Sequence, residues 1–263
     1  MIEFCFAAIG VTAPGMHDWQ MARQVLRGEC RYAPDDTPQP VAGMLPANER
    51  RRAVTSVRWA LTAAQEAMSA SGYAAGDVAT VFASSGGDGE TLHALCVALA
   101  GSEREVSPTR FHNSVHNAPA GYWSIAAGQR QPSVSLCVYD VSFAGGLVEA
   151  ASQACVERSA VLLVAYDIPY PQPLHAVRTV TRPFAVALLL TANPGRETLC
   201  RCRMSVESAA AGTTRAPGAL ASALADNPAA RAIPLLAMLA SDQRDTVRLD
   251  YLDGRQLAIE PLS

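Results

Sequence analysis

The sequence predicts an α/β fold in which a largely parallel, mixed sheet is flanked by helices. Continuous apolar runs of strand length alternate along the chain with Ala-rich segments of helix length. Runs without polar alternation are typical of strands that are buried on both faces. The 263 residues are 49% hydrophobic and 17% charged, which is enough apolar material for one core. Alternating strands and helices imply right-handed crossovers between parallel strands.

Apolar spacing, with Gly and Pro at the boundaries, predicts the elements of the first half. Ile2–Ile9 is an apolar run that ends before Gly10, which indicates a buried strand. An apolar stripe predicts one long helix over Glu49–Ala70, preceded by a Pro- and Asp-rich surface loop. The other expected elements are a helix at His17–Leu26, a strand at Val78–Ala83, a helix ending near Ala100, and a helix at Asn113–Ala127 with Pro119 at a kink or in its first turn.

The second half continues the pattern and then changes character. We expect a helix at Ala144–Val156 after a turn at Asp140–Phe143. The Ala-, Gly- and Thr-rich stretch at Ala209–Pro217 is a linker candidate, so we divide the chain into an α/β domain, 1–208, and a short helical and hairpin extension, 209–263, packed on the same domain. Three strands are expected at Ser133–Tyr139, Val161–Tyr166 and Ala185–Leu190, and a closing hairpin at Thr246–Leu252 and Gln256–Ile259.

Charge and composition exclude several classes of function. The net charge is −3 and the pI is near 6.0, so the chain lacks the basic field that a nucleic-acid partner requires. All 21 basic residues are arginine, which excludes a P-loop lysine or a Schiff base. No apolar run approaches the roughly 20 residues of a membrane span, and the first residues do not resemble a signal peptide. We therefore expect a cytoplasmic protein without membrane insertion.

Neither a metal nor a cofactor is expected. Asp88 and Glu90 form only an acidic pair in a loop, and Ser84–Gly87 lacks the glycine spacing of a phosphate-binding loop, which favours a tight turn. The cysteines lack the paired short spacing of zinc sites and are interpreted as buried free thiols. They are Cys5, Cys30, Cys96, Cys137, Cys155, Cys200 and Cys202.

Four segments in order resemble the N-terminal half of a β-ketoacyl synthase. They are FAAIGVTAPG with HDWQMARQVLRGE, then MLPANERRRAVTSVRWALTAAQEAM, then SPTRFHNSVHNAPAGYWSIA, and SVSLCVYDVSFAGGLVEAA. The resemblance implies the thiolase fold, here as its N-terminal half. The nearest subtype is the short ketosynthase-like protein of aryl-polyene and xanthomonadin-type biosynthesis, which the chain resembles over nearly its whole length.

The chain departs from active ketosynthases at the residues that carry the chemistry. The family places a cysteine thiol at a strand–helix elbow, where the helix N-terminus favours a thiolate. In the matching frame of this sequence, Asp140–Leu147, the nucleophile position holds Phe143. The family also uses two histidines from its second half, whereas no histidine follows the strand that ends near Leu190. The resemblance therefore implies a subunit without catalytic residues.

Other nucleophiles remain open at this point. Ser142 lies beside the elbow, although VSFAG is not the GxSxG motif of hydrolases. His112 and His116 have the i, i+4 spacing of one helix face, where they would serve as a base or, more simply, make capping or interface hydrogen bonds. Cys137 and Cys155 are expected to pack in a core strand and on the following helix.

The resemblance implies a chain-length factor, the inactive subunit that lines the acyl tunnel of an active ketosynthase. Its partners would be that ketosynthase, in a heterodimer, and an acyl carrier protein with a phosphopantetheine-bound acyl chain. The alternatives are a minimal acyltransferase or hydrolase that uses Ser142 or a cysteine, and a homo-oligomeric scaffold without an acyl substrate. The expected tunnel residues are Phe143, Trp123, Tyr122, Phe111 and His116, and the expected interface residues are Ser133, Ser135, Cys137, Val138, Tyr139 and Asn117.

Overall fold

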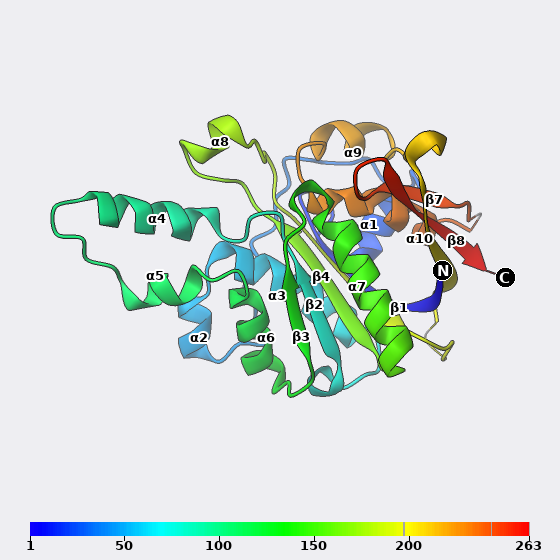
Figure 1. The fold of residues 1–263 in the computed structure, drawn as a ribbon, viewed down its shortest axis with the longest axis horizontal. Coiled ribbons are helices and arrows are strands. Elements are labelled where there is room, and N and C mark those ends of the chain that lie inside the picture. Colours follow the sequence, from blue (N-terminus) through cyan, green and yellow to red (C-terminus); the bar gives the residue numbers. More distant parts are fainter. Residues whose placement is uncertain (197, 243, 263) are drawn as a thin grey trace.

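A single mixed sheet runs through the molecule (Figure 1). The computed structural model describes residues 1–196, 198–242 and 244–262. Within this part of the chain the sheet has eight strands in the order β3-β2-β4-β5-β1-β6-β8-β7. The strands are β1 (Ile2–Thr12), β2 (Ala79–Ala83), β3 (Ser133–Leu136), β4 (Val161–Asp167), β5 (Phe184–Thr191), β6 (Cys200–Ser208), β7 (Val247–Asp250) and β8 (Arg255–Leu262).

The predicted α/β class and the mixed sheet are confirmed, but the expectation of a largely parallel sheet is wrong. Only β2 pairs in parallel, with β3 on one side and β4 on the other. The other five pairings in the described part of the chain are antiparallel. Apolar runs indicate that a strand is buried on both faces, but they carry no information on strand direction. The sequence therefore could not show that most of these strands pair antiparallel.

Helices cover both faces of the sheet and produce two apolar cores. One core lies under α3 and α6, and the other under α1, α7 and α10. A register shift in β1 between Phe6 and Ala8 changes which side chains face each core. Gly10 then faces α3 so closely that a Cβ would lie 2.1 Å from the carbonyl oxygen of Ala63. Only glycine fits at this contact between strand and helix.

One of the predicted helices is divided in two, and another begins later than predicted. The helix expected over Glu49–Ala70 is interrupted at Ala53 and Val54, whose backbones are extended, and Asn113 donates a side-chain hydrogen bond to the carbonyl of Arg52 at 2.9 Å. The helix expected at Asn113–Ala127 begins only at Ala118, because Asn113 is the last residue of the preceding helix, and Pro119 lies in its first turn. The helices are α1 (Trp19–Leu26), α2 (Ala47–Arg52), α3 (Thr55–Ser69), α4 (Gly89–Ala100), α5 (Pro108–Asn113), α6 (Ala118–Ala127), α7 (Ser142–Glu157), α8 (Leu174–Val177), α9 (Gly218–Ala223) and α10 (Ile233–Ala240).

Two strands also differ from the sequence-based expectation. β3 ends at Leu136, three residues before the predicted end at Tyr139. We predicted no strand at Cys200–Ser208, yet β6 pairs there with β1 and β8. The hairpin of β7 and β8 therefore extends the same sheet that contains β1. No helix in the described residues is long and apolar enough to cross a bilayer.

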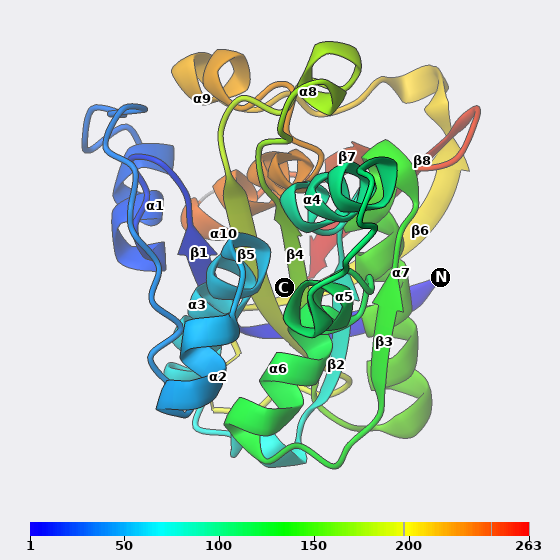
Figure 2. The ribbon, with the colours of Figure 1, turned by 90° about the vertical axis from the view of Figure 1, so that its left-hand side faces the viewer.

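The helices α4 and α5 form an arm that projects from the body of the molecule (Figure 1). In Figure 2 this arm points toward the viewer, in front of β2 and β3. Several apolar side chains are exposed on the arm and directly after it. They are Leu92, Val97, Leu99, Phe111 and Val115, with 51%, 58%, 54%, 65% and 49% of their surface accessible.

Candidate functional site

The elbow expected from the sequence lies where β3 leads into α7. Tyr139 begins a short 3-10 turn with φ +49°, an angle that is rare for a residue with a side chain. The Ser142 hydroxyl donates to the Tyr139 carbonyl at 2.7 Å and accepts from the Val138 amide at 2.9 Å. Ser142 is 1% exposed, so its hydroxyl holds the turn together and is closed to a substrate.

Phe143 lies in the first turn of α7 and is buried. Its side chain is 1% exposed and belongs to the core that α7 forms with the sheet. The residue at the strained point of the turn is Tyr139, whose side chain is 62% exposed. The aromatic ring that solvent reaches at this elbow is therefore that of Tyr139.

Charged groups join the elbow to later parts of the chain. Asp140 accepts a hydrogen bond from Arg178 at 2.7 Å, and its other oxygen lies 3.6 Å from the guanidinium of Arg231. The guanidinium of Arg178 also lies 3.8 Å from the centre of the Tyr139 ring, a cation–π contact. Neither arginine could be selected from the sequence, because both are far from the elbow along the chain.

A buried carboxylate lies at the end of β4, beside the elbow. Asp167 accepts hydrogen bonds from the Ser85 amide at 2.9 Å and from the hydroxyls of Ser85 and Ser84 at 2.8 and 3.1 Å. Burial raises the pKa of Asp167 to about 6, although the bonds from Ser85 and Ser84 act in the opposite direction. Sequence reasoning missed this residue; an acidic residue directly after an apolar strand was the available indication.

The predicted tight turn at Ser84–Gly87 is confirmed. The Ser84 hydroxyl accepts a hydrogen bond from the Gly87 amide at 2.9 Å. The ring of Tyr170 packs so tightly on this segment that a Cβ on Gly86 would lie 2.2 Å from its hydroxyl oxygen, and one on Gly89 2.4 Å from a ring carbon. The glycines therefore accommodate an aromatic ring of the same chain.

The two histidines of the expected helix face are separated. His112 lies in the last turn of α5, with its ring edge-to-face to Tyr122 at 5.9 Å, whereas His116 follows that helix. The His116 Nε2 atom lies 3.3 Å from the Ser84 carbonyl oxygen. The His112 side chain makes a ring contact and the His116 side chain makes a hydrogen bond, so the two histidines do not share one helix face.

The cysteines are free but less uniformly buried than expected. Cys137 is exposed, because β3 ends before it, and its thiol donates to the Ser85 carbonyl at 3.1 Å. This corrects its expected place in a core strand. Cys5, Cys200 and Cys202 are buried, Cys155 is half-buried, and Cys30, Cys96 and Cys137 are exposed.

The expected acidic pair does not form a metal site. Asp88 caps α4 by accepting from the Thr91 amide at 2.8 Å, and its second oxygen accepts from the Ser56 hydroxyl at 2.6 Å. Glu90 lies in the first turn of α4, where a negative charge is favourable. In the described residues no group of three or more His, Cys, Asp or Glu side chains is arranged to hold a metal ion.

The five expected tunnel residues do not meet in one place. Tyr122 and Trp123 on α6 are 1% and 0% exposed in the core beneath α3, whereas Phe143 belongs to the core on the opposite face of the sheet. Phe111 on the arm is 65% exposed, and His116 is half-buried beside Ser84. Of these five side chains, only Phe111 and His116 are accessible in the isolated chain.

Five of the six expected interface residues lie along or directly after the edge strand β3. Within the described chain, β3 pairs on one side only, with β2. Ser133, Cys137 and Tyr139 are exposed, and Ser135 and Val138 are half-buried. Asn117 is exposed at the start of α6.

The mixed eight-stranded sheet, with helices on both faces and a strand–turn–helix elbow near its edge, defines a thiolase-like α/β protein. The sequence profile of the family "Beta-ketoacyl synthase, N-terminal domain" matches residues 19–250. The chain belongs to this family. None of the curated proteins matches the sequence.

Solved structures share the fold at low sequence identity. A chain from "Ketosynthase (ApeO) in Complex with its Chain Length Factor (ApeC) from Xenorhabdus doucetiae" is 22% identical with a TM-score of 0.75, over 99% of this chain and 100% of that one. A chain from "The ishigamide ketosynthase/chain length factor" is 13% identical with a TM-score of 0.75, over 99% of both. A β-ketoacyl synthase from Burkholderia phymatum STM815 is 14% identical with a TM-score of 0.64, over 86% of this chain and 70% of that one.

Proposed function

We propose that this chain is the non-catalytic, chain-length-determining subunit of a heterodimeric β-ketoacyl-ACP synthase in aryl-polyene or related polyketide and fatty-acid biosynthesis. It would pair with an active, cytoplasmic ketosynthase that receives acyl chains from a carrier protein. The observation that carries the proposal is the open edge of β3 beside an arm with exposed apolar side chains. The ketosynthase–chain length factor complexes with the same fold support it.

The open edge is a suitable surface for pairing with another strand. The Thr80 amide donates to the Pro132 carbonyl at 3.0 Å and the Ser84 amide to the Leu136 carbonyl at 3.3 Å. In a parallel pair, alternate residues bond to the same neighbour, so the amide and carbonyl of Ser135 point away from β2. Unpaired groups on an edge strand, beside exposed apolar side chains, are normally covered by a partner in a soluble protein.

The absence of catalysis rests on the side chains at the elbow. Phe143 cannot accept an acyl group, and the Ser142 hydroxyl is buried and bonded to backbone atoms on both sides. No histidine of this chain follows His175. We expect the purified chain to form no acyl-enzyme with any acyl carrier protein, as measured by intact mass. A stable acyl adduct on Cys137 would favour the alternative of a minimal acyltransferase.

The pairing is tested most sharply at Ser135. The change Ser135→Pro removes an amide that points away from β2, so it should block strand addition and leave the fold intact. We expect it to abolish co-purification with the ketosynthase, whereas Ser135→Ala, which keeps the amide, should preserve it. Val138 is less suitable, because its methyl group packs on Gly145, where a Cβ would lie only 2.8 Å away.

The co-purification test requires that the Ser135→Pro variant remains folded. Circular dichroism and thermal unfolding of Ser135→Pro should match those of the wild type, since no internal hydrogen bond is lost. Normal co-purification of a folded Ser135→Pro chain would mean that β3 is not the interface. Stable homo-oligomers that ignore every ketosynthase would favour the scaffold alternative.

Control of chain length is a separate part of the proposal. We propose that Phe111, His116, Tyr122 and Trp123 line the tunnel, and we leave out Phe143, which lies in the core on the opposite face of the sheet. Phe111 is the one that can be shortened at little cost, because it is exposed. Truncation of buried Trp123 costs about 3–5 kcal/mol, so integrity of the complex must be checked beside product length. We expect longer products from an intact Phe111→Ala or Trp123→Ala heterodimer. Unchanged products from intact complexes of all four truncations would favour a scaffold that does not line the tunnel.

A further inference from the structure

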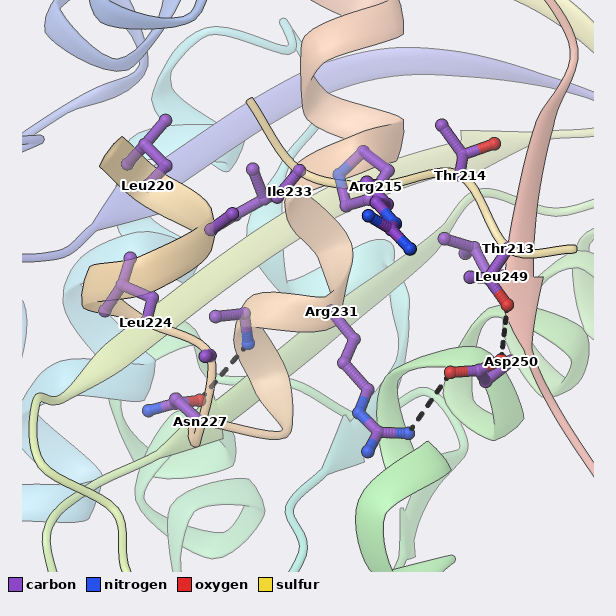
Figure 3. Close-up of a pocket in the computed structure, with 15 residues that line it drawn as sticks. Thr213, Thr214, Arg215, Leu220, Leu224, Asn227, Arg231, Ile233, Leu249 and Asp250 are labelled. Atoms are coloured by element: carbon purple, nitrogen blue, oxygen red, sulfur yellow. Dashed lines mark hydrogen bonds and ion pairs between the residues drawn. The ribbon is translucent and has the colours of Figure 1, made fainter. Parts of the chain in front are cut away.

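A cavity of about 280 Å³ lies in the C-terminal region of the chain. It is open to solvent on one side and is lined by the segment Thr213–Ala216, by α9, by the start of α10 and by β7. Figure 3 shows Leu220, Leu224 and Ile233 along one side of it. All three are buried, with 3%, 3% and 2% of their surface accessible. The size is near the lower end for small-molecule sites, and the lining is that of an apolar ligand site.

Two arginines, Arg215 and Arg231, line the same cavity. In the described chain nothing accepts a hydrogen bond from, or forms an ion pair with, the guanidinium of Arg215, which lines the cavity. Arg231 also lines the cavity. Its guanidinium forms ion pairs with the carboxylates of Asp140, at 3.6 Å, and Asp250, at 3.9 Å. Asp250 lines the cavity as well, and its charge is taken up by Arg231 on one oxygen and by a hydrogen bond from the Thr213 hydroxyl, at 2.5 Å, on the other. Arg215 is therefore the cation left without a counter-charge.

A second cavity adjoins the first at Arg231. It is lined by Asp140, Arg178, Thr179 and Asp226, together with Arg231 itself. The first cavity is mainly apolar and the second is mainly polar in its lining residues. Arg231 therefore lies between the apolar cavity and the charged residues around the elbow.

We propose that the apolar cavity binds a medium-chain carboxylate, with its hydrocarbon chain against Leu220, Leu224 and Ile233 and its carboxylate on Arg215. Charge complementarity selects this ligand class, because an apolar chamber with one unpaired guanidinium matches an apolar body with one negative head group. A neutral lipid would leave Arg215 without a partner. The proposal does not depend on pairing with a ketosynthase, since the cavity lies within one chain.

The test uses decanoate and the full-length chain. We expect decanoate to bind in isothermal titration calorimetry and to shift the methyl NMR signals of Leu220, Leu224 and Ile233. Decanol keeps the chain without the charge, and butyrate keeps the charge without the chain; both should bind at least about tenfold more weakly. Decanol binding as tight as decanoate, or no decanoate binding at millimolar concentration, would overturn the proposal.

Two variants locate the ligand. Arg215→Ala should weaken decanoate binding about 10- to 100-fold without loss of stability, because the side chain is exposed and without a partner. Ala221→Trp should fill the cavity and abolish binding. The matched control Arg130→Ala removes an exposed arginine elsewhere and should leave binding unchanged. Wild-type affinity in a folded Arg215→Ala or Ala221→Trp chain would place the ligand elsewhere and disprove the site.

Discussion

The two edge strands of the sheet, β7 and β3, differ in what lies on their outer side. At the β7 edge, the Thr214 amide donates to the Arg248 carbonyl at 2.8 Å, and the Thr214 hydroxyl accepts from the Arg248 amide at 2.9 Å. At the β3 edge, no strand of the described chain lies on the outer side. One edge is thus closed by a loop of the same chain, and the other is left open for pairing. The difference supports the proposal that β3 is the edge used for assembly.

The largest expected effect compares the same substitution at both edges. Leu249 on β7 is 3% exposed, whereas Leu136 on β3 is only half-buried. Leu249→Ala should lower the free energy of unfolding by about 2–5 kcal/mol. Leu136→Ala should cost less than half as much in the isolated chain, because part of its surface already contacts water. Urea unfolding of both variants measures this, and equal costs would show that the β3 edge is already closed.

A pH-dependent effect concerns the turn beside the open edge, which Asp167 holds. Burial raises the pKa of Asp167 to about 6 from its ordinary 3.8, so between these values the folded chain retains a proton that the unfolded chain releases. The contribution of this carboxyl to stability is therefore present at low pH and is lost as pH rises through 6. Asp167→Asn, which stays neutral, should be more stable than the wild type at pH 8 by about 1–3 kcal/mol.

The control for this effect is the difference in stability between wild type and Asp167→Asn at low pH. Near pH 4 both side chains are neutral, so thermal unfolding should give nearly equal stabilities for wild type and Asp167→Asn. Burial also raises the pKa of Glu66, to about 7, which adds a slope of the same sign to both proteins. A pH-independent difference between them would mean that Asp167 stays ionised in the fold.

The smallest expected effect tests the closed edge. Thr214→Val removes the hydroxyl that accepts from the Arg248 amide, at a cost of about 0.5–1.5 kcal/mol in the free energy of unfolding. Hydrogen exchange should report faster opening of β7. Thr213→Val is the matched control, because the hydroxyl of Thr213 bonds to the side chain of Asp250 and not to the backbone of β7. Equal exchange in the two variants would argue that the loop does not close the edge.

The sequence predicted the parts of the fold that periodicity encodes. The apolar runs identified β1, β2, β4 and β5, and the glycines and prolines marked most of their ends. β6 was missed although its pattern was available: Cys200, Cys202 and Met204 face inward and alternate with arginines and serine. Strand direction was not predictable in this way, because it depends on how the connections run.

The site was less predictable, because its contacts join residues far apart in sequence. Asn113 ends α2 from 61 positions away, and Asp167 holds a turn 82 positions away. The resemblance to ketosynthases located the elbow, but only the structure shows that Tyr139 is its strained and exposed residue. Side-chain direction was also beyond the sequence, which is why Trp123 and Phe143 were grouped although the sheet separates them.

The position of β1 in the sheet affects the order in which the protein can fold during synthesis. β1 is made first, yet it lies between β5 (Phe184–Thr191) and β6 (Cys200–Ser208). At about 5–20 residues per second, a ribosome needs roughly 10–35 s between the end of β1 and the start of β5. During that time the apolar residues of β1 have neither neighbouring strand. The core around β1 can therefore be completed only after the second half of the chain has been made.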